Sequence, residues 1–426
     1  MDGAARHRGY HTAVVSPFMP DAEKVDAVRT GLPAVEAGIY LNTGSVGPLP
    51  TETATAMAEV EARALQVGRA HPDDFPELVD RMNEARAGVA AVLSTDVEAI
   101  ALTHAVTEGM NHAAWSVDWR PGQRAVTSQL EHPGGIGALY ALRRRAGIEV
   151  AFVDVGTGGD EQQVIDAFDA AITPGTRLVS VSHVSWSTGA RLPVAAIAEI
   201  AHARGAVMAV DGAQSVGAIA VDLPATGADF YAVAAQKWLL GPEGMGALAV
   251  SSRVRDEARP AFGGWSTFER IDSRGTGEFW PDARRFDTAG YHRPSVVGMA
   301  RSIGWLTMYV GLDWVHRRGT ALAERAARQL AAIPEITVVT PMDRMATLVT
   351  FRIAGWPAQQ ALDELGARVF SIARTITDLD AVRISVGFYN TEAELDRFAE
   401  AVELLARHTP ETIPARRTLA ILGQDG

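Results

Sequence analysis

Two short stretches organise the interpretation of this sequence: VDGAQSVG at residues 210–217 and AQKWLLGPEG at residues 235–244. The first completes an apolar run, AVMAV at residues 206–210, which contains two β-branched residues. Such a run is typical of a strand that is buried on both faces of a parallel sheet. Asp211 then falls at the carboxyl end of the strand, where open α/β sheets bind their ligands. The stretch therefore predicts an α/β fold with a binding site at this edge.

Lys237 stands out because lysine is nearly absent from the chain. Of the 39 lysine and arginine residues, only Lys24 and Lys237 are lysines. Arginine can replace lysine as a solvated charge, but its guanidinium cannot form an imine with an aldehyde, because that step requires a primary amine that can lose its proton. Lys237 is therefore a candidate for covalent chemistry.

Asp211 and Lys237 together fit one cofactor. A buried aspartate is costly without a cationic partner, and a protonated pyridine nitrogen would supply one. The pairing keeps the ring cationic, so that the ring can accept electrons from a substrate carbanion, while the lysine anchors the aldehyde. These residues predict the protein's share of pyridoxal 5'-phosphate chemistry. In the alternative interpretation Asp211 caps a turn and Lys237 lies on the surface, which the pairing and the flanking glycines disfavour.

The two stretches resemble those of the class V, cysteine-desulfurase-like branch of the fold-type I pyridoxal-phosphate enzymes. In that branch an Asp-x-x-Gln pair, here Asp211 and Gln214, precedes a lysine on a Lys-Trp…Gly-Pro-x-Gly turn. The resemblance implies a large domain with a mostly parallel seven-stranded sheet and a smaller α+β domain. The expected units are an N-terminal segment (1–50) that joins the small domain and the rim of the active site, a large cofactor-binding domain (51–294) and a C-terminal small domain (295–426).

Composition excludes several other classes of function. The chain has 426 residues, of which 47% are hydrophobic and 21% charged, as expected of a globular protein with a large core. A net charge of −12 disfavours nucleic acid or an anionic membrane as a partner. The sequence has no apolar run of about 18 residues and its first residues lack the apolar core of a signal peptide, so we expect a cytoplasmic protein. The 11 histidines show no metal-ligand spacing, so no metal site is expected.

The chain contains no cysteine. This excludes disulfides, thiolate metal sites and a cysteine nucleophile. A desulfurase that carries sulfur away as a persulfide on its own cysteine therefore cannot operate here.

A phosphate site is predicted where residues 99–103, a strand, turn into a helix through HAVTEG at residues 104–109. Amides at the start of a helix point toward an anion, and the helix dipole favours negative charge there. The predicted contacts are the amides of Val106 and Thr107 and the Thr107 hydroxyl. A simple Thr cap is compatible with the sequence, and the family's Thr-Glu pattern favours the phosphate site.

Two aromatic side chains are predicted near the cofactor by the resemblance. His132 alone would more often be a capping or surface residue, but Glu131-His132 matches the family's Glu-His, whose imidazole stacks on the pyridine ring; such a histidine could also move protons at the substrate. Trp186 stands where many family members have asparagine. In this respect the chain resembles the narrower cystine C–S lyase subgroup, which carries tryptophan there, so Trp186 is placed at the substrate.

Other positions depart from the family pattern. The family's Ser-x-His-Lys is replaced by residues 234–237, AAQK, in which Gln236 can donate a hydrogen bond but cannot titrate. In relatives the segment matching residues 286–294 reaches across a dimer interface toward the partner's phosphate, which implies a homodimer with shared active sites. Gly290 and Tyr291 replace the usual small hydroxyl pair. Tyr291, His292 and Arg293 are alternative ligand contacts, or all three pack only at the interface.

Arginines are predicted to bind the substrate carboxylate. Arg383 lies in an expected half-buried strand and needs an anion, and a planar guanidinium pairs two-pronged with a carboxylate. Resemblance to the family's Arg-x-Ser…Tyr-Asn-Thr implies the substrate α-carboxylate for Arg383. The cystine lyases add a second arginine at the spacing of Arg374. Asn42, in a Gly- and Pro-rich turn, is either a substrate contact or part of a linker.

The spacing of apolar residues predicts the remaining elements. Residues 261–290, rich in glycine and tryptophan, are interpreted as a long active-site loop. The expected strands are 99–103, 124–128, 178–185, 206–210, 336–339, 346–353 and 381–388. The expected helices are 21–29, 51–70, 75–93, 358–365 and 391–407, with a further helical segment that begins at 295–319.

These features together predict a C–S lyase that acts by β-elimination on cystine or a cysteine S-conjugate. The main alternatives are an isopenicillin-N-epimerase-like enzyme and an aminotransferase, since both begin by removing the same Cα proton, possibly in natural-product biosynthesis. A pyridoxal-phosphate-binding protein without turnover is a third hypothesis, motivated by Ala234 and Gln236. The presence of both Asp211 and Lys237 argues against it.

Overall fold

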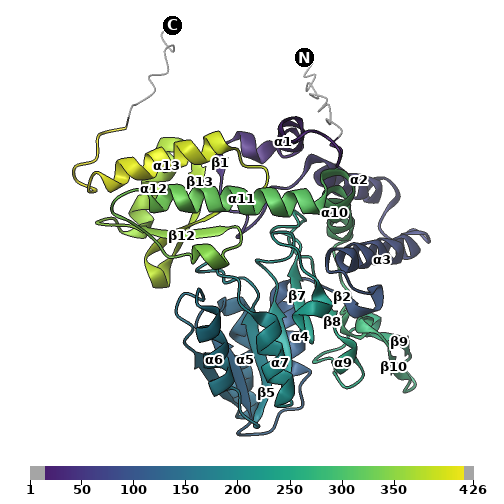
Figure 1. The fold of residues 1–426 in the computed structure, drawn as a ribbon. Coiled ribbons are helices and arrows are strands. Elements are labelled where there is room, and N and C mark those ends of the chain that lie inside the picture. Colours follow the sequence, from purple (N-terminus) through teal and green to yellow (C-terminus); the bar gives the residue numbers. More distant parts are fainter. Residues whose placement is uncertain (1–14, 417–426) are drawn as a thin grey trace.

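A seven-stranded sheet forms the centre of the large domain (Figure 1). The computed structural model describes residues 15–416; residues 1–14, where the absence of a signal peptide was predicted, and residues 417–426 lie outside this range. The strand order is β2-β8-β7-β6-β5-β3-β4, and only β8 runs antiparallel to its neighbours. The strands are β2 (Ile100–Thr103), β3 (Arg124–Ser128), β4 (Glu149–Val153), β5 (Thr176–Ser182), β6 (Val207–Asp211), β7 (Phe230–Ala234) and β8 (Gly246–Val250).

Both faces of this sheet are buried, which explains why its strands are apolar runs without alternation. Successive side chains of a strand point to opposite faces. In β5, Leu178 packs in a cluster with residues of α4 and α5, whereas Val179 packs in the cluster that contains residues of α6 and α7. The helices of this domain are α4 (Val106–Trp115), α5 (Pro133–Ala146), α6 (Glu161–Ala171), α7 (Val194–Ala203), α8 (Leu223–Thr226) and α9 (Ser252–Arg255).

The small domain is an antiparallel four-stranded sheet in the order β11-β12-β15-β14, with helices packed against it. Its strands are β11 (Ile336–Val338), β12 (Leu348–Ile353), β14 (Arg374–Ile376) and β15 (Ala381–Ser385). Its helices are α11 (Leu312–Ala331), α12 (Ala358–Val369) and α13 (Glu392–Ala406). The N-terminal segment joins this domain, because β1 (Ile39–Tyr40) pairs in parallel with β13 (Ser371–Ile372).

Helices connect the two domains. The predicted helices near the N-terminus are confirmed as α1 (Asp21–Thr30), α2 (Thr51–Val67) and α3 (Asp74–Val92). Helix α10 (Arg293–Gly304) packs on α2 and α3 and continues through a π-helical turn (Trp305–Val310) into α11. The domain boundary expected after residue 294 thus falls in the first turn of a helix. Within residues 15–416, no helix combines the length and apolarity needed to cross a membrane.

The prediction that residues 261–290 form one long loop is wrong. This segment contains a hairpin of β9 (Phe268–Ile271) and β10 (Gly277–Phe279), which lies at the edge of the large domain beside α9 (Figure 1). Its strands are short and largely exposed, so they carry no apolar pattern. The turn of the hairpin had a sequence signal, because DSRG at residues 272–275 combines an aspartate with a glycine. In the structure the Asp272 carboxylate accepts from the amides of Arg274 and Thr276, and Gly275 has a φ of 116°.

Candidate active site

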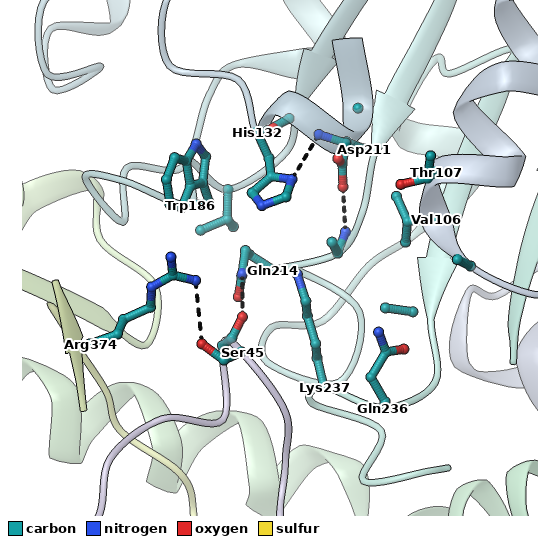
Figure 2. Close-up of a pocket in the computed structure, with 18 of the residues that line it drawn as sticks. Ser45, Val106, Thr107, His132, Trp186, Asp211, Gln214, Gln236, Lys237 and Arg374 are labelled. Carbon is teal, nitrogen blue, oxygen red and sulfur yellow. Dashed lines mark hydrogen bonds between the residues drawn. The ribbon is translucent and has the colours of Figure 1, made fainter. Parts of the chain in front are cut away.

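A cavity of about 270 Å³ lies at the carboxyl ends of β5, β6 and β7, whose last residues Ser182, Asp211 and Ala234 line it (Figure 2). Its other walls come from the starts of α4 and α5, the loops that follow the three strands, the N-terminal segment and the small-domain strands β14 and β15. The cavity brings together all but four of the predicted site residues. The predicted residues that line it are Val106, Thr107, His132, Trp186, Asp211, Gln214, Gln236, Lys237, Arg374 and Arg383.

Lys237 follows β7 in a tight turn in which the Leu240 amide donates to the Lys237 carbonyl. Burial lowers the pKa of Lys237 to about 8; the negative charge of Asp211 opposes this shift, whereas the positive charges of Arg383 and Arg374 add to it. A larger fraction of the amine is therefore neutral near pH 7 than for an exposed lysine. The neutral amine is the form that can attack a carbonyl carbon or accept a proton.

Asp211 is buried at the end of β6 without a cationic partner. One carboxylate oxygen accepts from the Ala213 amide at 2.9 Å, as Figure 2 shows, and the side chain is 5% exposed. Among residues 15–416, no lysine, arginine or histidine forms an ion pair with it. A buried carboxylate of this kind favours a cationic ligand.

His132 is the N-cap of α5 and accepts from the Gly134 amide at Nδ1, at 3.0 Å. Burial lowers its pKa, as does the charge of Lys237, whereas Asp211 opposes the shift. The imidazole is therefore neutral at pH 7 and carries its proton on Nε2. Its ring meets the indole of Trp186 edge to face, with centroids 5.0 Å apart. His132 can thus offer an aromatic face and one N–H to a ligand.

The predicted phosphate end is built from free amides. The N-cap of α4 is Ala105, which has no side chain to cap the helix, so the Thr cap considered from the sequence is not present. The amides of Val106 and Thr107 therefore start the helix beside the cavity. The side-chain oxygen of Gln236 is buried there and has no hydrogen-bond partner. Gln214 uses its oxygen for Trp238 and one amide hydrogen for the Gly44 carbonyl, which leaves its second amide hydrogen available.

The predicted substrate end contains two arginines and an indole. Arg383 is fully buried; its Nη1 donates to the Trp186 carbonyl at 2.7 Å, while Nε and Nη2 have no partner. Burial, with the charge of Arg374, lowers the pKa of Arg383 to about 9. Arg374 is half-buried, and its Cζ lies 5.3 Å from the centroid of the Trp186 ring. Free donors in a buried site predict an anionic ligand.

The residues present fit pyridoxal 5'-phosphate. The unpaired carboxylate of Asp211 suits a protonated ring nitrogen, and the amides at the start of α4 suit a phosphate. Two glycines keep the space between Asp211 and the start of α4 open. A Cβ at Gly134 would lie 2.9 Å from the Thr107 hydroxyl, and one at Gly135 would lie 2.8 Å from an Asp211 oxygen. Lys237 stands in the same cavity with a reactive amine.

The family model of aminotransferase class-V matches residues 39–398. The chain belongs to this family. Membership indicates pyridoxal 5'-phosphate as the cofactor of a class-V enzyme. The matched residues run from β1 into α13 and so include both domains.

Relatives of this class-V enzyme include several activities. It is 31% identical to isopenicillin N epimerase from Streptomyces clavuligerus, over 86% of this chain and 94% of the relative. It is 28% identical to a probable cysteine desulfurase from Methanothermobacter thermautotrophicus, over 90% of this chain and 98% of the relative. A solved complex of the cystine C–S lyase C-DES with its product cysteine persulfide superimposes with a TM-score of 0.83 at 24% identity, over 87% of this chain and 99% of that one. This likeness confirms the predicted fold.

Four predicted site residues of the class-V enzyme do not line the cavity. Asn42 accepts from the Ser45 hydroxyl at 2.8 Å and so orients a neighbour that does line it. Tyr291 is 7% exposed, and its hydroxyl donates to the Leu102 carbonyl within its own chain. Gly290 and His292 flank it: Gly290 has a φ of 78°, and His292 is the N-cap of α10 on a separate surface cavity.

Several lining residues escaped the sequence analysis, among them Ser45, Gly134 and Gly135. Ser45 contacts Arg374 at 3.5 Å through its hydroxyl. Gly134 and Gly135 form the close approaches described above, and a signal for them was available: glycine is unfavourable in a helix, yet α5 begins with Pro133 and this pair. Ser45 had no comparable signal, because its position depends on how residues 39–48 pack between the domains.

Proposed function

We propose that this protein is a pyridoxal-phosphate-dependent C–S lyase that acts by β-elimination on cystine or a cysteine S-conjugate. The observation that carries the proposal is one cavity that combines an enclosed lysine amine, an unpaired buried aspartate and a buried arginine with two free donors. The first two residues suit chemistry at Cα, and the third suits the carboxylate of an amino acid. Since the chain has no cysteine, sulfur cannot leave on a protein thiol.

The chain's own residues bind the substrate and move one proton. Pyridoxal phosphate, when bound, supplies an aldehyde for the substrate's amino group and a ring that accepts the electron pair left at Cα. Arg383 holds the α-carboxylate through its free Nε and Nη2. Lys237 removes the Cα proton with its neutral amine. The Nε2–H of neutral His132 can donate a hydrogen bond to the sulfur, which leaves as an anion. The Cβ–S bond then breaks, and hydrolysis of the three-carbon product gives pyruvate and ammonia.

An epimerase or aminotransferase is the second candidate, supported by the 31% identity to isopenicillin N epimerase. These reactions begin with the same proton removal by Lys237 and differ in where a proton returns. Elimination requires a leaving group on Cβ. A protein that binds the cofactor without turnover is less well supported, because Lys237 stands in the cavity with a lowered pKa.

We also propose a homodimer in which residues 290–293 approach the partner's site. Its support is a surface cavity of about 960 Å³ that is lined by α2, α3 and residues 291–297 and bordered by Leu65, which is 88% exposed. Large exposed apolar side chains in a groove favour a protein contact. Light scattering of the purified protein tests this: a dimer mass supports the proposal, and a monomer at micromolar concentration contradicts it.

The experiment that tests the function is a screen of amino acids and S-conjugates with the cofactor-loaded protein. Pyruvate together with a released thiol or persulfide supports elimination. Amino transfer to 2-oxoglutarate, or exchange of the Cα proton for deuterium without pyruvate, supports the second candidate. A protein that binds the cofactor but changes no amino acid contradicts both.

A further inference from the structure

The side-chain amide of Gln214 is held by two partners of opposite kinds. The indole Nε1 of Trp238 donates to the Gln214 oxygen at 2.9 Å, and the Gln214 nitrogen donates to the Gly44 carbonyl at 2.8 Å. Gln214 and Trp238 are each 3% exposed, so both hydrogen bonds are shielded from water. An indole N–H can only donate, and a carbonyl can only accept. The two partners therefore fix which end of the amide faces which way.

A reversed amide would be unfavourable at both ends. Its NH₂ group would face the N–H of Trp238 and its oxygen would face the Gly44 carbonyl, so contacts between like groups would replace both hydrogen bonds. In the observed orientation the oxygen is turned to Trp238, and one hydrogen on the nitrogen has no partner among these groups. Gln214 lines the cavity, so its nitrogen is the end that can serve a ligand there.

Trp238 directly follows Lys237 in the chain. The turn that carries the reactive amine thus also carries the residue that orients Gln214. The backbone of this turn is held closely from below β6: a Cβ at Gly217, whose φ is 87°, would lie 2.7 Å from the Trp238 carbonyl oxygen. The side chains of Lys237 and Gln214 both line the cavity (Figure 2). The position of the amine and the orientation of the amide are therefore set by one structural unit.

We propose that Trp238 is a positioning residue for the cofactor, which orients Gln214 so that its free amide hydrogen donates to the ring hydroxyl oxygen of pyridoxal phosphate. The hydroxyl and the aldehyde of the cofactor are on neighbouring ring carbons, so a donor that shares the cavity with Lys237 can meet this oxygen. Such a hydrogen bond stabilises negative charge on the oxygen. The proposal concerns the cofactor and not the fate of the substrate, so it holds equally for elimination, epimerisation and amino transfer.

The pH dependence of the absorbance of the cofactor-loaded protein tests the proposal. When Lys237 holds the cofactor, one proton is shared between the lysine nitrogen and the ring oxygen, and its loss changes the colour. A donor at the oxygen favours the form without this proton, so it lowers the pH midpoint of the colour change. We expect Gln214→Leu to raise the midpoint by about one pH unit, as for one hydrogen bond to a charged group. Trp238→Phe is expected to raise it by about half a unit, because the Gly44 carbonyl alone still orients the amide.

The double variant shows whether Trp238 acts through Gln214. Gln214→Leu combined with Trp238→Phe is expected to have the midpoint of Gln214→Leu alone, because no amide is left to orient. The charged groups that act on Lys237, which are Asp211, Arg374 and Arg383, are the same in all these variants. Shifts that add in the double variant would overturn the proposal, and so would a wild-type midpoint in Trp238→Phe.

Two further variants separate the lost donor from lost packing. Trp356→Phe is the matched control, since its indole is also buried and donates to the carbonyls of Leu405 and His408 in the small domain. It is expected to keep the wild-type midpoint, and the melting temperature of its apoprotein shows what the loss of a buried indole donor costs in folding. Replacement of Trp238 by benzothienylalanine keeps the shape of the indole and puts a sulfur in place of the N–H. This protein is expected to show the shift of Trp238→Phe; a wild-type midpoint would overturn the proposal.

Discussion

Gly135 lies directly against Asp211: a Cβ added to the glycine would stand 2.8 Å from the Asp211 Oδ2 atom. This is closer than carbon and oxygen approach without a bond, so no other residue fits at position 135 while the carboxylate keeps its place. The start of α5 thereby fixes the position of the acid at the end of β6.

Gly135→Ala is expected to weaken cofactor binding by about tenfold or more, because the carboxylate must move away from the ring nitrogen it would pair with. Titration of the apoprotein with pyridoxal phosphate measures the change. Gly137→Ala in the same helix is the control, since nothing lies within 4 Å of its added Cβ. Equal affinity in the two variants would contradict the role given to Gly135.

Lys237 is expected to hold the cofactor covalently. Borohydride reduction of the loaded protein, followed by digestion and mass spectrometry, should place the label on the peptide that contains Lys237. Lys24 provides an internal control, because its Nζ donates to the carbonyls of Pro17 and Val310 in the interior. A label on Lys24, or a yellow colour that survives in Lys237→Ala after reduction and dialysis, would disprove the assignment.

The rate at which apoprotein takes up the cofactor is expected to depend on pH through Lys237. Its pKa is lowered to about 8, chiefly by burial. The protonated amine does not attack an aldehyde, so the rate rises as pH increases through about 8 and levels off above it. Stopped-flow absorbance across pH 6 to 10 measures this profile. A rise that continues to pH 10, as for an exposed lysine, would show that the amine is not enclosed in this way.

Gln236→Leu separates cofactor binding from folding. The buried Gln236 oxygen has no partner, so an apolar side chain of similar size removes an unsatisfied group without opening a cavity. We expect the melting temperature of the apoprotein to stay the same or rise, while the affinity for pyridoxal phosphate falls by roughly tenfold through loss of the amide donor. An unchanged affinity would place Gln236 outside the phosphate site.

The large sheet and the chemistry of Asp211 and Lys237 could be predicted because each depends on local signals. Apolar runs without alternation indicate strands covered on both faces, and Val179 and Leu178 do pack on opposite sides of β5. Lys237, one of only two lysines in an arginine-rich chain, stands out without knowledge of its neighbours.

Other features depend on segments that are distant in sequence. Ser45 follows β1, which pairs with β13 far along the chain, and the buried Tyr291 donates its hydroxyl to the distant Leu102 carbonyl. The β9–β10 hairpin escaped prediction because its strands are short and exposed, so they bury no apolar face. The lining residues that could be predicted belong to recognisable motifs or have distinctive chemistry. Lining residues such as Ser45 could not be predicted, because tertiary packing brings them to the cavity.

The segment around Gly44 and Gly47 connects three parts of the molecule. Its carbonyl at Gly44 accepts from Gln214, its amide at Gly47 donates to the Gln236 carbonyl, and the preceding strand belongs to the small domain. Shortening the chain to the boundaries of the large domain would therefore delete part of the wall of the cavity along with the N-terminal segment. Any attempt to isolate the cofactor-binding half must carry residues 39–48 with it.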